Sequence, residues 1–574
     1  MKMSMVELKD LRSQIIGGDS TFETPFGERL LTYCDYTASG RCLGFIENYL
    51  HKLQKIYANT HTEDDVTGRN MTQLLHDAEQ IIKACVNAGP DGRIISVGTG
   101  STGAIWKFQQ IVGVALPPAT RQLLFSLYRE LEGEESLRKM LAFLEKNQPV
   151  VFVGPYEHHS NEISWREGLS TVLEVKMSED GTIDLEHLES LLQNPEYSNR
   201  LRIGSFSAAS NVTGIISPVH EIARLLHQYD ALACFDYAAS APYVKIDMNP
   251  GSDPLNALDA IFISPHKFIG GPGSNGILVF NKKVYDTELS PTMGAGGTVD
   301  YVSPDGHVFI ENIEEREKPG TPGVLQTLKT ALVFQLKDAI GVKKIEKREQ
   351  ELLQKVFEKW MANDQIEILG NLDLSKRIAI ISFNVRGPRG NYLHPKFVTR
   401  LLNDLFGIQS RAGCSCAGPY GHRLLNIDQQ TSLQYRDCIQ KGFQGIKPGW
   451  CRLGFHFVMD DTEADFVIDA VEFIADKGYC FLSLYDFDLQ SGQWVHKQER
   501  DLTDHFSLTA ALESKSSESS SLDENIRRAV YQSYLQQAES LAADLSKTPL
   551  EQHTLEGEIG ELQFFSLPQG SYSS

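Results

Sequence analysis

Two residues of this sequence, Lys267 and Asp236, combine a reactive side chain with a position where α/β proteins bind ligands. Lys267 follows the apolar run Ala260–Ser264, and Asp236 closes the earlier run Ala231–Phe235. Ligands of parallel sheets bind just beyond the carboxyl ends of the strands. The two residues are about one βαβ unit apart, roughly 30 residues, so we expect them on neighbouring strand ends. An acid at this place can pair with a protonated ring nitrogen, which is the arrangement that pyridoxal phosphate needs. By itself, Lys267 could be an ordinary surface charge.

A glycine-rich turn, Gly98-Thr99-Gly100-Ser101-Thr102-Gly103, follows another apolar run and opens a helix at Ala104. Its backbone N–H groups, the helix dipole and the hydroxyls of Ser101 and Thr102 suit a phosphate group. The turn lacks the lysine of a P-loop, which argues against an NTP-hydrolysing enzyme. A turn with a purely structural role is the alternative.

His158 lies in Glu157-His158-His159-Ser160-Asn161, directly after the apolar run Val150–Val153. A histidine at this place offers a flat ring that can stack on a cofactor. A metal site at the histidine pair would need a third ligand, and none lies at a convincing spacing. The context therefore favours a role at the cofactor.

Short β-branched runs alternate with helical stretches between about Arg93 and Phe280. Helical periodicity appears at Leu185–Leu192 and Val219–Tyr229. This alternation predicts an α/β fold with a mostly parallel, seven-stranded sheet flanked by helices. The expected strands are Arg93–Val97, Val150–Val153, Leu201–Phe206, Ala231–Phe235, Ala260–Ser264 and Gly276–Phe280.

The domain organisation follows from changes in pattern along the chain. We expect a large cofactor-binding domain at residues 30–300, with a helical insertion at about Pro117–Gln148 that packs onto it. A smaller α+β domain is expected from residues 1–29 and 317–490. It contains one long helix (about Leu328–Trp360), strands near Ile366–Leu369 and Ile378–Val385, and a helix at Pro395–Leu405. Residues 491–574 form a C-terminal extension with a serine-rich linker, Ser514–Ser521, and an amphipathic helix from Ile526 to Leu545.

Composition limits the classes of partner. The formal net charge is −21, which disfavours binding to nucleic acid or to anionic membranes. No apolar run is long enough for a membrane span, and the first residues show no signal peptide. The nine cysteines are thinly spread, so we expect reduced thiols and a cytoplasmic protein.

Taken together and in order, the motifs resemble the class V aminotransferase family of pyridoxal phosphate enzymes with fold type I. The closest resemblance is to the cysteine desulfurase and selenocysteine lyase branch, from about Thr32 to Ala475. The motifs that carry it are Asp35-Tyr36-Thr37-Ala38-Ser39, Tyr57-Ala58-Asn59-Thr60-His61, Ser264-Pro265-His266-Lys267, Arg411-Ala412-Gly413-Cys414-Ser415-Cys416-Ala417 and Cys451-Arg452.

The resemblance implies a role for each matched residue at the cofactor. Lys267 would bind the cofactor and move the Cα proton, Asp236 would keep the ring nitrogen protonated, and His158 would stack on the ring. Asn211 would hydrogen-bond the phenolic oxygen. The side chains implied for the phosphate are Ser101, Thr102, Ser264 and His266.

It also implies a substrate site and a partner subunit. Arg452 would clamp the carboxylate of an amino acid as a bidentate ion pair, with Asn211 and Ala38 beside the substrate. Thr321, in Gly320-Thr321-Pro322, is similar to a residue that reaches the phosphate of the partner subunit, which implies a homodimer.

Cys416 lies at the position of the desulfurase nucleophile. The implied enzyme binds L-cysteine or selenocysteine through an external aldimine, releases alanine and leaves persulfide sulfur on Cys416, with a sulfur-acceptor protein as a possible partner. One alternative keeps the cofactor without a catalytic cysteine: a class V aminotransferase, a C–S lyase or an epimerase. A cofactor-free scaffold is the other alternative.

Three features depart from the family pattern. Ala239 stands where the family has a glutamine. Cys414 and Cys416 form a Cys-x-Cys pair, which leaves open a resolving pair, a weak metal site with His422, or sequence drift. The residues after about Gln490 have no counterpart in the compact members of the family, so their role is open.

Overall fold

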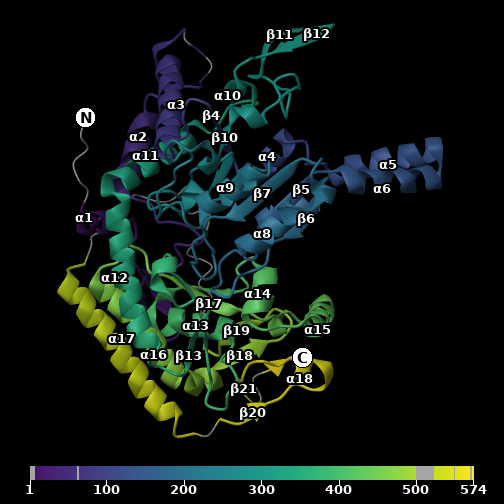
Figure 1. Cartoon of the computed structure of the whole chain (residues 1–574). Coiled ribbons are helices and arrows are strands. Elements are labelled where there is room, and N and C mark those ends of the chain that lie inside the picture. The colour runs from purple at the N-terminus through teal and green to yellow at the C-terminus, as the bar shows by residue number, and fades with distance from the viewer. Residues whose placement is uncertain are drawn as a thin grey trace. The chain divides into compact units, whose positions relative to one another are not determined.

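The computed structural model describes residues 7–60, 62, 64–498, 522–548, 550–568 and 572–573. These residues form two compact units. The first contains Ser39–Glu346 and Lys376–Ile378, and the second contains Glu7–Ala38, Lys347–Ser375 and Ala379 onward (Figure 1). The expected serine-rich linker, Ser514–Ser521, lies outside the described residues.

The first unit is built on a sheet that has seven strands among the described residues, in the order β4-β10-β9-β8-β7-β5-β6. All neighbouring pairs from β9 to β6 are parallel, and only β10 runs antiparallel to its neighbours β4 and β9. The mostly parallel α/β fold expected from the sequence is therefore confirmed. The strands are β4 (Gly92–Val97), β5 (Val150–Val153), β6 (Thr171–Glu174), β7 (Arg202–Ser207), β8 (Leu232–Asp236), β9 (Ala260–Ile263) and β10 (Gly276–Asn281).

Strand β6 is the strand that the apolar pattern did not identify. Each of its residues is half-buried, whereas every residue of β5, β7 and β9 is buried. The central strands are covered on both faces, which gives continuous apolar runs. Strand β6 lies at one edge of the sheet and is only four residues long, with threonine and glutamate at its ends, so it has no such run.

Helices accompany the strands in the first unit. Ala104, Ile105 and Phe108 of α4 pack in one buried cluster with residues of the sheet such as Phe262 and Leu278. The helices are α2 (Gly44–Gln54), α3 (Val66–Cys85), α4 (Gly100–Ile111), α5 (Pro118–Glu132), α6 (Glu134–Asn147), α7 (Ile163–Arg166), α8 (Leu185–Leu192), α9 (Val219–Gln228), α10 (Ile313–Arg316) and α11 (Val324–Ile340). A small ribbon, β11 (Val299–Ser303) and β12 (Gly306–Phe309), precedes α10.

The helical insertion differs from its expected role as a packing element. Helices α5 and α6 form a hairpin, but α5 has no buried residue and α6 buries only Leu137. In Figure 1 the pair extends away from the sheet. The apolar stripe that suggested packing onto the domain therefore lies partly in solvent.

The expected single helix Leu328–Trp360 is two helices, α11 and α12 (Val342–Trp360). They are separated by Gly341, which has a φ of 88°. A residue with positive φ cannot continue a right-handed helix, and glycine takes up that conformation at little cost. One glycine therefore ends α11, although the apolar periodicity continues past it into α12.

The second unit contains a four-stranded sheet in the order β13-β14-β17-β16. Its strands are β13 (Ile366–Ile368), β14 (Ile380–Val385), β17 (Trp450–Gly454) and β16 (Arg411–Gly413), with smaller pairings by β1 (Thr21–Thr24), β2 (Gly27–Leu30), β3 (Thr32–Tyr33), β15 (Ile408–Gln409), β18 (Tyr485–Asp488), β19 (Gln493–His496), β20 (Gln552–His553), β21 (Leu567–Pro568) and β22 (Tyr572–Ser573). Its helices, besides most of α12, are α1 (Leu8–Arg12), α13 (Pro395–Phe406), α14 (Gly418–Leu424), α15 (Gln429–Gln440), α16 (Asp461–Lys477), α17 (Glu524–Leu545) and α18 (Gly557–Glu561).

The amphipathic helix expected in the C-terminal extension is α17. Its tyrosines reach the N-terminal strands: the hydroxyl of Tyr534 accepts a hydrogen bond from Leu30 N at 3.0 Å, and Tyr531 bonds Thr32 at 3.3 Å. The ring of Tyr531 also stacks on Phe466 of α16, with centroids 4.0 Å apart. The extension is thus packed into the second unit. No helix in the described ranges is long and apolar enough to span a bilayer.

Candidate active site

Asp236 and Lys267 lie on adjacent strand ends of the first unit. Asp236 is the last residue of β8, and Lys267 ends the short helical turn Pro265–Lys267 that follows β9. The two strands are parallel, with Asp236 opposite Phe262. Burial raises the pKa of Asp236, while the bond from Ala238 N at 2.8 Å and the charge of Lys267 oppose that shift. The structure therefore brings together the acid and the amine that the sequence predicted.

The glycine-rich turn and the turn after β9 form one polar cradle. Ser101 N, in the first turn of α4, donates to Ser264 Oγ at 2.8 Å. Gly100 has a φ of 59°, and a Cβ there would come 2.8 Å from Ser264 Oγ and 3.6 Å from His266 Nε2. Burial and the charge of Lys267 lower the pKa of His266 to about 4, so its ring is neutral at pH 7. Ser101, Ser264 and His266 thus surround one small space.

His158 is connected to the same turn through Ser160. Its Nδ1 accepts a hydrogen bond from Ser160 N at 3.2 Å, and Ser160 Oγ lies 2.7 Å from Thr102 Oγ1. Since Nδ1 is an acceptor, the neutral ring carries its proton on Nε2. These contacts fix the ring of His158 relative to the exposed Thr102.

Glu157 is a buried acid that the sequence analysis did not assign to the site. Its carboxylate accepts hydrogen bonds from Ser207 N (2.8 Å), Ser207 Oγ (2.7 Å), Asn161 Nδ2 (2.7 Å) and Gly154 N (3.2 Å). Ser207 is the cross-strand neighbour of Asp236. Burial, with a further contribution from Asp236, raises the pKa of Glu157 to about 7. Its place beside His158 in the sequence was the available signal, but the bonds to β7 appear only in the fold.

Two other residues predicted at the cofactor, Asn211 and Thr321, also lie in the first unit. Asn211 is buried in the loop after β7, where Ser210 Oγ accepts hydrogen bonds from Val212 N at 3.1 Å and Thr213 N at 3.2 Å. Thr321 is exposed, and its Oγ1 accepts a hydrogen bond from Asn59 Nδ2 at 3.3 Å.

The predicted substrate-binding residues Arg452 and Ala38 belong to the second unit, where Asp35 holds two arginines. Arg452 Nη2 donates to Asp35 Oδ1 at 3.1 Å, and Arg411 Nε donates to Asp35 Oδ2 at 2.9 Å. Arg411 and Arg452 are direct partners in the β16–β17 register. Arg452 is buried, which lowers its pKa, whereas Arg411 is exposed. Ala38 N bonds Asp35 O, so Ala38 lies in the turn that carries this acid.

Cys416 lies in a tight turn after β16. Ala417 N bonds Cys414 O at 3.0 Å, and the two residues between them, Ser415 and Cys416, have φ values of 51° and 56°. Left-handed backbone at two consecutive non-glycine residues is uncommon and costs free energy. Trp450 Nε1 holds Ser415 Oγ at 3.2 Å. The turn presents Cys416 as an exposed thiol, while Cys414 is half-buried.

The suggestion of a metal site at the cysteine pair finds no support. Both ring nitrogens of His422 have partners, Gly418 O at 2.8 Å and Ser432 Oγ at 2.8 Å. In the part of the chain that the structure describes, no three His, Cys, Asp or Glu side chains gather as metal ligands would.

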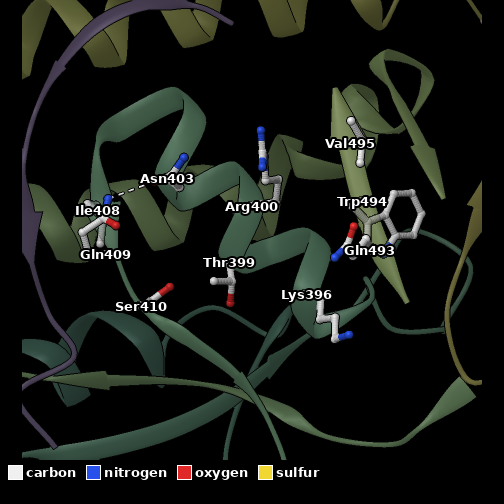
Figure 2. Close-up of a pocket in the computed structure, with 10 residues that line it drawn as sticks. All are labelled: Lys396, Thr399, Arg400, Asn403, Ile408, Gln409, Ser410, Gln493, Trp494 and Val495. Carbon is white, nitrogen blue, oxygen red and sulfur yellow. Dashed lines mark hydrogen bonds between the residues drawn. The ribbon is translucent and has the colours of Figure 1, made fainter. Parts of the chain in front are cut away.

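A cavity of about 490 Å³ in the second unit is distinct from the predicted site (Figure 2). Side chains from α13, β15 and β19 line it, and none of the residues predicted for the cofactor or the substrate is among them. The lining residues are Lys396, Thr399, Arg400, Asn403, Ile408, Gln409, Ser410, Gln493, Trp494 and Val495.

The residues of the first unit fit a pyridoxal phosphate group. A buried acid suits a protonated ring nitrogen, and an amine lies near enough for its charge to act on that acid. The close approach of Gly100 to Ser264 leaves the cradle without a Cβ that would fill it. The backbone N–H groups at the start of α4 suit a phosphate.

Comparison with known sequences agrees with this fit. The model of the family "Aminotransferase class-V" matches residues 137–467. A probable cysteine desulfurase of Halalkalibacterium halodurans is 30% identical over 273 residues, which are 47% of this chain and 62% of that protein. A probable cysteine desulfurase of Staphylococcus aureus is 27% identical over 414 residues, 71% of this chain and 88% of that protein. The match thus spans less than two thirds of the first relative.

Solved structures share the fold. The apo cysteine desulfurase of Thermococcus onnurineus has a TM-score of 0.63 at 20% identity, covering 83% of this chain and all of that one. The cysteine desulfurase CsdA of Escherichia coli has a TM-score of 0.60 at 17% identity, covering 82% of this chain and 98% of that one. Since the family model covers more than half of the sequence and the cradle suits the cofactor, this chain belongs to the class V aminotransferases, a family of pyridoxal phosphate-dependent enzymes.

Proposed function

We propose that the protein is a cysteine desulfurase that acts on L-cysteine or selenocysteine and releases alanine. The observation that supports this most directly is an exposed Cys416, in a turn built on β16, in a chain that also carries Asp236 and Lys267 on adjacent strand ends. The desulfurase relatives support the same choice of reaction.

The first unit would bind the cofactor and transfer the proton at the Cα of the substrate. Pyridoxal phosphate, when bound, supplies an electron sink for the Cα carbanion. Lys267 would hold the cofactor and move the proton, while Asp236 would keep the ring nitrogen protonated. The ring of His158 would stack on the cofactor, and Asn211 would donate to its phenolic oxygen. The phosphate would lie among Ser101, Thr102, Ser264 and His266.

The second unit would supply the carboxylate site and the thiol. Arg452 would bind the substrate carboxylate with Asn211 and Ala38 nearby, and Asp35 would keep its guanidinium oriented before substrate binds. The thiolate of Cys416 would attack the substrate sulfur. A new S–S bond forms while the Cβ–S bond breaks, and the carbon that loses sulfur takes up a proton to give alanine.

The proposal extends to assembly and location. Thr321 would reach the phosphate site of a partner subunit in a homodimer, and the persulfide would pass to an acceptor protein. All nine cysteines are free thiols, which supports a reducing compartment such as the cytoplasm.

A second candidate retains the cofactor and dispenses with the thiol: an aminotransferase, an epimerase or a C–S lyase. The observation that favours it is Ala239, which is buried at a position where the family pattern has a glutamine near the cofactor. Without that hydrogen bond the electron sink is altered, and the fate of the carbanion can change with it.

Replacing each cysteine of the pair separates the two candidates. We expect Cys416→Ser to lose alanine release from L-cysteine by a factor on the order of 10² or more while the cofactor absorbance is retained, with Cys414→Ser as the matched control. Lys267→Ala should keep the fold and lose the cofactor band. Full turnover in Cys416→Ser, with pyruvate or a 2-oxo acid as product, would reject the desulfurase and leave the second candidate.

A further inference from the structure

The hairpin of α5 and α6 leaves a broad apolar surface on the first unit. Four leucines of α5 are largely exposed: Leu123 (58%), Leu124 (52%), Leu127 (54%) and Leu131 (78%). On α6, Phe143 is 66% exposed. Monomeric proteins rarely expose large contiguous apolar patches, which are typical of interaction surfaces.

The spacing of these leucines is that of a helix-packing seam. Leu124, Leu127 and Leu131 are separated by three and four residues, so they follow one stripe along α5. The half-buried Phe125 and Tyr128 lie on another side of the same helix, the side suited to contact α6. Stripes with three- and four-residue spacing pack against a second helix by inserting side chains between its side chains. The exposed seam therefore lacks the helix that its pattern fits.

The charges along α5 identify a self-complementary partner. Arg121 lies near the beginning of the helix, in an exposed pair with Glu167 at 3.5 Å. Glu130 and Glu132 lie at the end of the helix, where the cation Arg129 is paired with Glu134 of α6 at 2.7 Å. An antiparallel copy of the same helix would place Arg121 opposite Glu130 and Glu132, and the symmetric contact would repeat the pair. A parallel copy would place like charges opposite each other. A two-fold axis with the same surface on both subunits is the commonest form of self-association.

We propose that α5 packs antiparallel on α5 of a second copy of this chain, so that the two hairpins form a four-helix contact. The leucine seam forms the centre of this contact, and Arg121 with Glu130 and Glu132 fixes its direction. This contact does not depend on the desulfurase reaction, and it is additional to any subunit contact through Thr321.

The first test measures molar mass by light scattering and sedimentation on the full-length protein with its cofactor. The double variant Leu127→Glu, Leu131→Glu is expected to halve the molar mass, or to weaken association at least tenfold. Because both side chains are exposed, the melting temperature and the cofactor absorbance should stay unchanged. Leu433→Glu is the matched control, since this leucine is 44% exposed on the helix α15 of the other unit. An unchanged mass in the double variant would overturn the proposal.

The second test addresses direction and partner. Arg121→Glu should weaken association, since it places acid against acid, and Glu130→Arg with Glu132→Arg should do the same. Combining all three substitutions restores opposite charges and should recover the wild-type mass. A combined variant that remains dissociated would show that α5 does not pair with itself in this way.

Discussion

At the scale of single residues, the buried acid Glu157 connects two strand ends of the site. Its oxygens take hydrogen bonds from the chain after β5 and from Ser207 at the end of β7. Four donors around one carboxylate accommodate its charged form, yet burial outweighs them and raises its pKa to about 7. The chain around His158 is thus held to the end of β7 by a carboxyl group whose pKa is close to neutral pH.

This titration makes stability depend on pH. Because the pKa of Glu157 is raised from 4.5 to about 7 in the folded state, the folded protein keeps a proton that the unfolded chain releases. The stabilisation is fully present below about pH 4.5 and is lost as the pH rises through about 7, an effect of at most about 3 kcal/mol. Glu157→Gln cannot titrate, so its melting temperature should lie further below the wild type at pH 5 than at pH 8. Equal differences at the two pH values would contradict this. Glu135→Gln, on the exposed surface of α6, is the control.

Asp35 shows why some residues of the site were beyond sequence reasoning. The family resemblance implied Arg452 as a carboxylate clamp, a role that the fork geometry of arginine suits. Its bond to Asp35 joins residues 417 positions apart, which no local pattern encodes. Lys267, Asp236 and the glycine-rich turn could be placed in advance because strand ends of a parallel sheet gather ligands at one edge.

At the scale of elements, local sequence patterns predicted the bounds of those helices and strands whose position depends mainly on their own residues. The helix Leu185–Leu192 has the predicted bounds, and most predicted strands differ by a residue or two from those observed. Strand β6 was missed because none of its four residues is buried, whereas β4, at the other edge, buries Gly92, Ile94 and Ile95. The hairpin was expected to pack onto the first unit because a stripe of leucines indicates that a helix packs against a neighbour. The stripe does not show which neighbour that is.

Gly341 decides a helix boundary, and its replacement tests that role. A Cβ at Gly341 would meet no atom within 4 Å, so Gly341→Ala changes only the backbone preference. With φ at 88°, we expect a loss of roughly 1–3 kcal/mol in the free energy of unfolding, measured in urea. Gly306→Ala is the control, because its Cβ also meets open space and its backbone is not in the positive-φ range. An equal effect in both variants would mean that the break between α11 and α12 does not depend on glycine.

At the scale of the whole molecule, two helices that are far apart in the sequence, α1 and α17, belong to one unit. Arg527 of α17 is buried and forms ion pairs with Asp460 and with Asp19, the latter at 3.5 Å. Arg12 of α1 reaches the same group of acids and bonds Glu463 at 3.2 Å. The C-terminal extension therefore contributes to the packing of the second unit.

Two neighbouring arginines of α17 provide a matched test. Arg527→Ala removes one of the two cations beside Asp19 and Asp460 and leaves only Arg12 there. Loss of one partner of a buried pair costs up to about 3–5 kcal/mol. Arg528 is exposed and, among the residues that the structure describes, pairs with Glu524 of its own helix and with Thr462. Arg528→Ala should therefore change stability by no more than about 0.5 kcal/mol. Thermal unfolding of both variants checks the difference. Similar melting temperatures would show that α17 is only loosely attached.

The contacts of Tyr531 and Tyr534 with the N-terminal strands have an evolutionary consequence. We expect substitutions around Leu30 and Thr32 to be selected together with substitutions in α17, because these two residues bond Tyr534 and Tyr531. Recombination that exchanged only one end would join parts with mismatched surfaces. Descendants of this chain should therefore change together around Leu30–Thr32 and in α17.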